Sequence, residues 1–135
     1  VGILDLETGI LKLCNAGHNP PILIYPDGQV SYLEFKTQIF VGVVEDFKYS
    51  DEEVVLEKES KLFLYTDGVT EAENINKELY GEEKLLEMLS DNASSDVRTT
   101  VNVVVDSIAS HVKEAEASDD LTILLIQYEP GTANS

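Results

Sequence analysis

Residues 61–68, KLFLYTDG, place apolar side chains on both alternating faces of an extended chain and then stop at an Asp-Gly pair. A run of this kind predicts a strand that is covered on two sides. Residues 121–128, LTILLIQY, predict another strand, which follows directly after Asp119-Asp120. Carboxylates therefore stand at the end of one predicted strand and at the beginning of another.

Shorter apolar runs predict further strands before this stretch, at residues 1–6, 10–14, 22–25, 30–35 and 49–57. Two intervening segments, residues 7–9 and 26–29, have the Gly, Pro and Asp residues typical of tight turns. Apolar residues at helical spacing predict helices at 82–90 and 96–112, with starts at Gly81 and at residues 94–96. This order predicts an α+β protein in which antiparallel sheets carry helices on one face.

Composition narrows the functional classes. The 135 residues, 43% of them apolar, fit one globular domain. The 9 basic and 26 acidic residues give a net charge of −17, which argues against nucleic acid and anionic lipid as partners. The single cysteine, Cys14, cannot form an internal disulfide, and no apolar run approaches the roughly 20 residues of a membrane helix. We therefore expect a cytoplasmic protein without membrane contact, and the strand-like opening at Val1 predicts a piece of a longer chain.

The acidic residues at the two strand ends are candidates for a metal site. If the strands at 61–66 and 121–128 are antiparallel neighbours, Asp67, Asp119 and Asp120 lie at the same edge of the sheet. Clustered carboxylates suit a hard divalent cation such as Mg²⁺ or Mn²⁺, and Gly68 would let backbone and metal-bound water approach closely. The alternative is purely structural, because Asp-Gly after a strand often forms a turn and Asp-Asp before a strand is often a solvated loop or a cap.

Several motifs occur together in a recognisable order. They are LYTDGVTEA at residues 64–72, Tyr80-Gly81, SDDLT at residues 118–122 and NAGHNPP at residues 15–21. Together they resemble the C-terminal part of the stage II sporulation protein E family. That family comprises bacterial serine phosphatases, including the RsbU-like regulators of sigma factors, and it is related to the metal-dependent type 2C protein phosphatases. The resemblance extends from the first predicted strand to about Tyr128.

The resemblance implies a four-layer α-β-β-α sandwich with two Mn²⁺ or Mg²⁺ ions at one edge of the central sheets. Asp67 and Asp119 match the family's aspartate ligands and would be the catalytic residues, while Gly68 and Asp120 would complete this part of the metal site. The implied reaction is attack of a metal-activated water on phosphoserine or phosphothreonine. The implied partner is a phosphorylated protein of the anti-anti-sigma type.

The sequence departs from the family pattern at its N-terminal side. Two further acidic motifs of the full family domain have no counterpart here, and Asp5 is no substitute because its segment lacks the glycine-rich continuation. We therefore expect residues 1–129 to be the C-terminal portion of a phosphatase domain that alone binds metal weakly and has little activity, with residues 130–135 as a disordered tail. The alternative is a non-catalytic, phosphatase-like module that binds a partner or forms a homodimer through exposed sheet surface.

Other chemically notable residues are assigned structural roles. The loop around His18 matches the family's Ala-Gly-His-x-Pro signature, in which the imidazole would fix neighbouring backbone. His111 is expected to pack at the edge of the core, and Cys14 to be a buried, inert thiol. The acidic segment from Glu71 to Glu87 predicts a solvated surface, with a role in the approach of a protein substrate as the weaker alternative.

Overall fold

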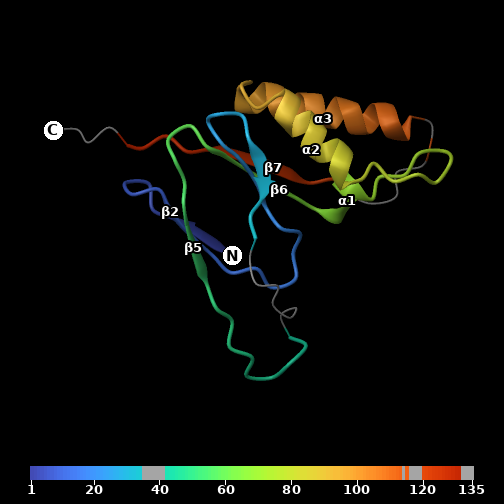
Figure 1. The fold of residues 1–135 in the computed structure, drawn as a ribbon. Coiled ribbons are helices and arrows are strands. Elements are labelled where there is room, and N and C mark those ends of the chain that lie inside the picture. Colours follow the sequence, from blue (N-terminus) through green and yellow to red (C-terminus); the bar gives the residue numbers. More distant parts are fainter. Residues whose placement is uncertain (35–41, 114, 116–119, 132–135) are drawn as a thin grey trace.

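The computed structural model describes residues 1–34, 42–113, 115 and 120–131, and it contains two antiparallel sheets with helices on one side (Figure 1). One sheet has the strand order β1-β2-β5 and contains β1 (Gly2–Leu4), β2 (Ile10–Leu13) and β5 (Glu52–Val55). The other has the order β4-β3-β6-β7 and contains β3 (Ile22–Ile24), β4 (Val30–Tyr32), β6 (Lys61–Tyr65) and β7 (Ile123–Gln127). The helices are α1 (Asp67–Thr70), α2 (Glu82–Asp91) and α3 (Val97–Val112). The prediction of an α+β protein with antiparallel sheets is confirmed.

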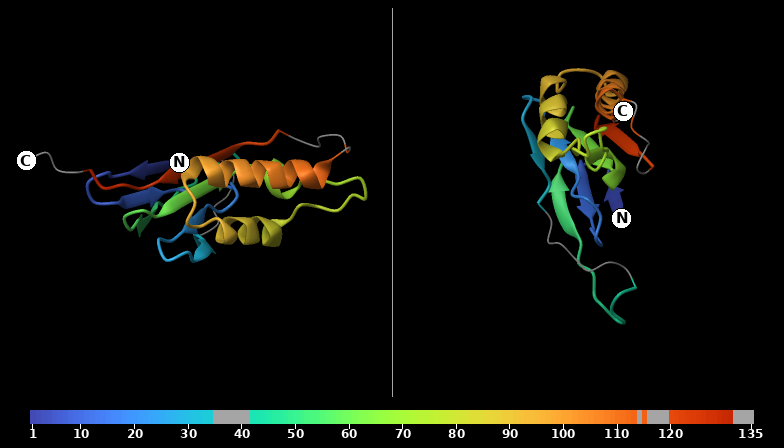
Figure 2. Two further views of the ribbon diagram at one scale, coloured as in Figure 1. Left: turned by 90° about the horizontal axis from the view of Figure 1, so that it is seen from above. Right: turned by 90° about the vertical axis from the view of Figure 1, so that its right-hand side faces the viewer.

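Strand β6 lies between two cores, as the two-sided apolar pattern predicts. Phe63 and Tyr65 belong to the core between the four-stranded sheet and the helices, and both are almost fully buried. Leu62 and Leu64 point the other way and pack in the core between the two sheets, with Leu11 of β2. Alternate residues of one strand thus hold the three layers together. The further views in Figure 2 show α2 and α3 along one side of the strands.

Helices α2 and α3 form where the apolar spacing predicts them. Their buried residues, Leu85 and Leu89 on α2 and Val104 and Ile108 on α3, pack in the helix-side core. Gly81 is the N-cap of α2, and Asp96 is the N-cap of α3, where its carboxylate accepts a hydrogen bond of 3.0 Å from the Thr99 amide. The predicted helix starts are therefore confirmed.

The sequence misses one element. The structural alternative for Asp67-Gly68 was a turn, but residues 67–70 form the short helix α1, in which Gly68 and Val69 are buried. A buried valine directly after the glycine anchors this turn of helix to the helix-side core.

Two predicted strands are shorter in the structure. The predicted strand at 49–57 shortens to Glu52–Val55, and the one at 30–35 shortens to Val30–Tyr32, with residue 35 outside the described part. Residues 132–135 of the predicted tail also lie outside it, so the tail stays a prediction. In the parts of the chain that are described, no helix has the length and apolar character needed to cross a membrane.

Candidate functional site

The pairing of β6 with β7 brings the two acidic segments to the same edge of the four-stranded sheet. The strands are antiparallel neighbours, and their register ends at the pair Tyr65 and Ile123. One residue beyond that pair, the Thr66 amide donates a hydrogen bond of 3.1 Å to the Thr122 carbonyl. The condition on which the metal site depends, that the end of one strand meets the start of the other, is thus met.

Thr66 fastens the beginning of α1 to the segment that contains Asp120. Its hydroxyl donates to the Asp120 carbonyl at 3.3 Å and accepts from the Thr122 amide at 3.1 Å. Thr66 is the N-cap of α1, yet its side chain makes no capping bond to the helix. The hydroxyl therefore joins two segments that are far apart in the sequence. Sequence reasoning missed this residue, although its place between a buried strand and Asp-Gly was a usable signal.

Gly68 permits the closest approach between these two segments. A Cβ atom added to Gly68 would lie 2.4 Å from the Asp120 carbonyl oxygen and 3.1 Å from its carbonyl carbon. Contacts that short exclude any side chain at this position unless backbone moves. The expectation that glycine allows a close approach at this position is confirmed for two backbone segments, because the backbone of Gly68 lies against the backbone of Asp120.

The two carboxylates at this edge are open to solvent, whereas their surroundings are buried. Asp67 and Asp120 are both exposed, while Gly68 and Tyr65 are buried. Burial, followed by the neighbouring hydroxyl of Tyr32 and the charges of Glu82 and Asp67, raises the pKa of Tyr65. Tyr65 therefore stays a neutral phenol at physiological pH.

The described residues supply part of a metal-binding shell. Exposed carboxylates on adjoining backbone segments are donors of the type that Mg²⁺ and Mn²⁺ prefer. Asp119, the second predicted catalytic ligand, lies outside the described residues, so its distance from Asp67 is not defined. Within the described ranges, no group of three or more His, Cys, Asp or Glu side chains is placed to hold a metal ion. The ligand set Asp67, Gly68, Asp119 and Asp120 therefore stays a prediction.

Asp5 and His18 make local hydrogen bonds. The Asp5 carboxylate accepts from the backbone amides of Glu7 and Thr8 at 2.9 and 3.0 Å, and these bonds lower its pKa. Asp5 thus closes a turn. His18 lies in a loop closed by Asn15, whose side chain makes two hydrogen bonds of 2.8 Å with the His18 backbone. The ring Nδ1 of His18 lies 3.2 Å from the carbonyl oxygen of Asn19. The ring contact agrees with the expected structural role.

His111 and Cys14 were both expected to have structural roles. His111 Nε2 lies 2.9 Å from the Glu78 carbonyl oxygen, and its ring meets Tyr80 edge-on with 5.6 Å between ring centroids. This agrees with packing at the edge of the core, and it adds a contact with a loop that the sequence did not predict. Cys14 is half-buried rather than buried.

Comparisons with known proteins point to one family. The family model for stage II sporulation protein E (SpoIIE) matches residues 1–129. Protein IcfG of Synechocystis is 27% identical over 125 residues, which cover 93% of this chain and 19% of IcfG. Phosphoserine phosphatase RsbP of Bacillus subtilis is 28% identical over 127 residues, which cover 93% of this chain and 29% of RsbP. The chain thus spans less than a third of either relative.

A solved structure supports the same fold. The phosphatase domain of SpoIIE from Bacillus subtilis, presoaked with Mn, superposes with a TM-score of 0.73 at 14% sequence identity, covering 98% of this chain and 56% of that one. The two sheets and their helices are therefore part of a type 2C phosphatase fold. On the family match over residues 1–129, the chain belongs to the SpoIIE family of bacterial phosphatases.

Proposed function

We propose that this chain is the C-terminal portion of a metal-dependent protein serine/threonine phosphatase. The observation that carries the proposal is the junction of β6 with β7, where Thr66 and Gly68 hold the Asp67 turn against the backbone of Asp120. Asp67 and Asp119 would be the catalytic metal ligands, and Gly68 and Asp120 would shape the same site. Family membership supports the reaction class.

In this proposal each part of the edge has a definite task. A bound pair of Mn²⁺ or Mg²⁺ ions would supply an activated water and neutralise charge on the phosphoryl group. Asp67 and Asp119 would hold that pair, with Asp120 next to them. Thr66 keeps the two segments in register, and the solvent exposure of Asp67 leaves the edge open to a phosphorylated side chain.

The substrate and setting are part of the proposal. We infer a phosphorylated regulatory protein of the anti-anti-sigma type, acting in the cytoplasm within sigma-factor regulation. Residues 1–135 contain no counterpart of two further acidic motifs of the full family domain, which supports weak metal binding and low activity for these residues alone. The complete site would need acidic residues from the rest of a longer protein.

Phosphopeptide hydrolysis tests this function. The full-length protein that contains this chain should release phosphate from a phosphoserine peptide in the presence of Mn²⁺, and the isolated chain should release little. Asp67→Asn should reduce turnover by at least about 100-fold, because a metal ligand is lost. Asp91→Asn is the matched control, since Asp91 is exposed at the end of α2 and should be neutral. Full activity of the Asp67→Asn protein would refute the assignment.

A specific observation favours a second function, a non-catalytic module that self-associates. Leu124 and Ile126 lie on the face of β7 that is turned toward the inter-sheet core, because the register pairs them with Leu64 and Leu62. They are nevertheless 54% and 38% exposed. Apolar surface of this kind suits a homodimer contact. Light scattering after size exclusion should give the monomer mass of 14.9 kDa if the phosphatase proposal alone holds, and twice that mass if this contact forms.

A further inference from the structure

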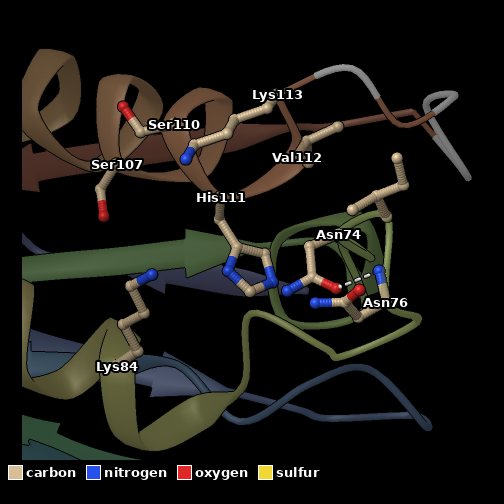
Figure 3. A pocket seen from close by; sticks show the side chains of 9 residues that line it. Asn74, Asn76, Lys84, Ser107, Ser110, His111, Val112 and Lys113 are labelled. Carbon is tan, nitrogen blue, oxygen red and sulfur yellow. Dashed lines mark hydrogen bonds between the residues drawn. The ribbon is translucent and has the colours of Figure 1, made fainter.

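A hollow lined by different residues from those of the acidic edge lies between α3, the beginning of α2 and the loop at residues 72–80 (Figure 3). Its volume is about 680 Å³, within the range of small-molecule sites in proteins. None of Asp67, Gly68 and Asp120 lines it. Lys84, His111 and Lys113 do line it, so three basic side chains from two helices and their ends meet around one space.

Tyr80 contacts three side chains that line this hollow, although it does not line the hollow itself. Its ring is buried, and its hydroxyl donates a hydrogen bond of 2.9 Å to Ser107 Oγ on α3. The Lys84 ammonium lies 4.9 Å from the centroid of the same ring, and His111 meets the ring edge-on. Three polar groups are thereby held around one rigid aromatic side chain, which reduces the entropy lost when they bind a ligand.

The charge at this hollow contrasts with the rest of the chain. The net charge is −17, yet two of the nine basic residues, Lys84 and Lys113, line the same space. Ion pairs within the described residues involve Lys12 and Lys77, and neither Lys84 nor Lys113 has a carboxylate within 4.0 Å there. Lys84 also lines a neighbouring hollow with four carboxylates, Glu71, Glu82, Glu83 and Glu87, but none of these four forms an ion pair with it. An anion in the hollow described here would therefore meet the Lys84 ammonium without displacing an ion pair of these carboxylates.

The donors suit one class of anion. We propose that this hollow binds a phosphate monoester, with the phosphoryl group between Lys84 and Lys113. Lysine ammonium groups are compact point charges that bind phosphate from several directions, and the hydroxyl of Ser110 adds a neutral donor on the same wall. Ile75 and Val112 give the hollow apolar surface, which suits the organic part of an ester better than a bare ion.

This site does not depend on the proposed phosphatase reaction. Its residues lie outside the acidic edge, and a phosphate held by ammonium groups needs no metal. The monoester can be a free small molecule or a phosphorylated side chain of a protein. Both carry the same headgroup, so the test must separate them.

Binding to the 135-residue chain in EDTA tests the proposal without any contribution from a metal. O-phospho-L-serine and a phosphoserine peptide are titrated by calorimetry and by amide NMR, with L-serine as the control for the headgroup. Lys84→Gln with Lys113→Gln is the double variant, and Lys58→Gln is the matched control because Lys58 is exposed in the turn before β6. Neither mutated lysine of the hollow is buried, so the double variant should fold, which thermal unfolding checks.

We expect both phosphorylated probes to bind and to shift the amide signals of Asn74, Asn76 and His111. Affinity should fall at least about tenfold in the double variant and stay unchanged in Lys58→Gln. Tighter binding of the peptide identifies a phosphoprotein as the source of the ligand, and equal or tighter binding of O-phospho-L-serine identifies a small molecule. The proposal is wrong if L-serine binds equally well, if the folded double variant keeps full affinity, or if neither phosphorylated probe binds.

Discussion

Gly68 offers a sharp test of the geometry at the acidic edge. The methyl group introduced by Gly68→Ala would lie 2.4 Å from the Asp120 carbonyl oxygen, whereas ordinary contacts begin at 3.4 Å. One of the two backbone segments must therefore move by about 1 Å. Such a shift weakens the 3.3 Å hydrogen bond from Thr66 and displaces the acidic segment from its position beside α1.

Two opposing effects set the size of the stability change. Overpacking costs typically 1–3 kcal/mol, and replacing glycine by alanine within a helix returns up to about 1 kcal/mol. We expect a net loss of about 1–2 kcal/mol, or roughly 4–8 °C in the melting temperature of a domain of this size. A displacement of 1 Å at a catalytic site costs about 100-fold in rate, so phosphatase activity of the full-length protein should fall by about that factor.

The control is Gly28→Ala, which separates lost stability from a displaced site. Gly28 has φ of +91° in the turn between β3 and β4, and an added Cβ would meet only Ala93 Cβ, at 3.9 Å. Alanine is strained there by about 1–2 kcal/mol, which matches the expected loss for Gly68→Ala. Calorimetric melting and phosphopeptide turnover are measured on both variants. Normal turnover by Gly68→Ala, or an equal fall in both variants, would refute the reasoning.

Three further substitutions test separate contacts. Tyr80→Phe removes the hydrogen bond to Ser107 and should lower the free energy of unfolding by about 1 kcal/mol in urea denaturation. Thr66→Val keeps the shape but loses both hydrogen bonds of the hydroxyl, to the Asp120 carbonyl and from the Thr122 amide. Urea denaturation should therefore show a loss of about 1–2 kcal/mol, now accompanied by reduced phosphatase turnover. Asp96→Ala removes the N-cap of α3. Hydrogen bonds to Thr99 hold the pKa of Asp96 in the folded protein below 3.8, so the wild type keeps the stabilisation from this carboxylate above pH 3.8 and loses it as the pH falls through the lowered pKa. The melting temperature of the variant should lack the part of the pH dependence that comes from Asp96.

For each of these three predictions, one result would contradict it. A wild-type unfolding curve for Tyr80→Phe would mean that water replaces the hydroxyl without cost. Unchanged turnover by Thr66→Val would separate the threonine from the site. If the melting temperature of Asp96→Ala falls as steeply below pH 3.8 as that of the wild type, other carboxylates cause the acid sensitivity.

Much of the fold follows from local sequence patterns. The two-sided pattern of β6 predicts its burial between layers, and helical spacing with Gly81 and Asp96 predicts both long helices and their starts. The spacing of polar and apolar residues can be read from a short stretch of sequence, and it indicates whether a helix or strand buries one face or two. Local spacing did not show that β6 and β7 are antiparallel neighbours; this was the condition for the predicted metal site, and the strand register confirms it.

What the sequence did not predict depends on contacts between distant residues. Asp-Gly is typical of a turn, so α1 becomes evident only when Val69 is seen in the helix-side core. The role of Thr66 requires knowledge of which backbone faces its hydroxyl, and the contact of His111 with the Glu78 carbonyl requires the path of a loop. Local propensity carries no information about such partners. The distance between Asp67 and Asp119 stays untested by the described residues.

The bond from Thr66 to Asp120 spans 54 positions of the polypeptide. Neither half of the acidic edge can reach its arrangement through local structure, because β6 and β7 must first pair across the intervening helices. Contacts of such long range are costly to close and are made during the main cooperative folding step. Exchange of the Thr66 and Thr122 amide protons with deuterated solvent should therefore require global rather than local opening. Ligand-binding competence in this domain is then acquired together with the fold and lost together with it.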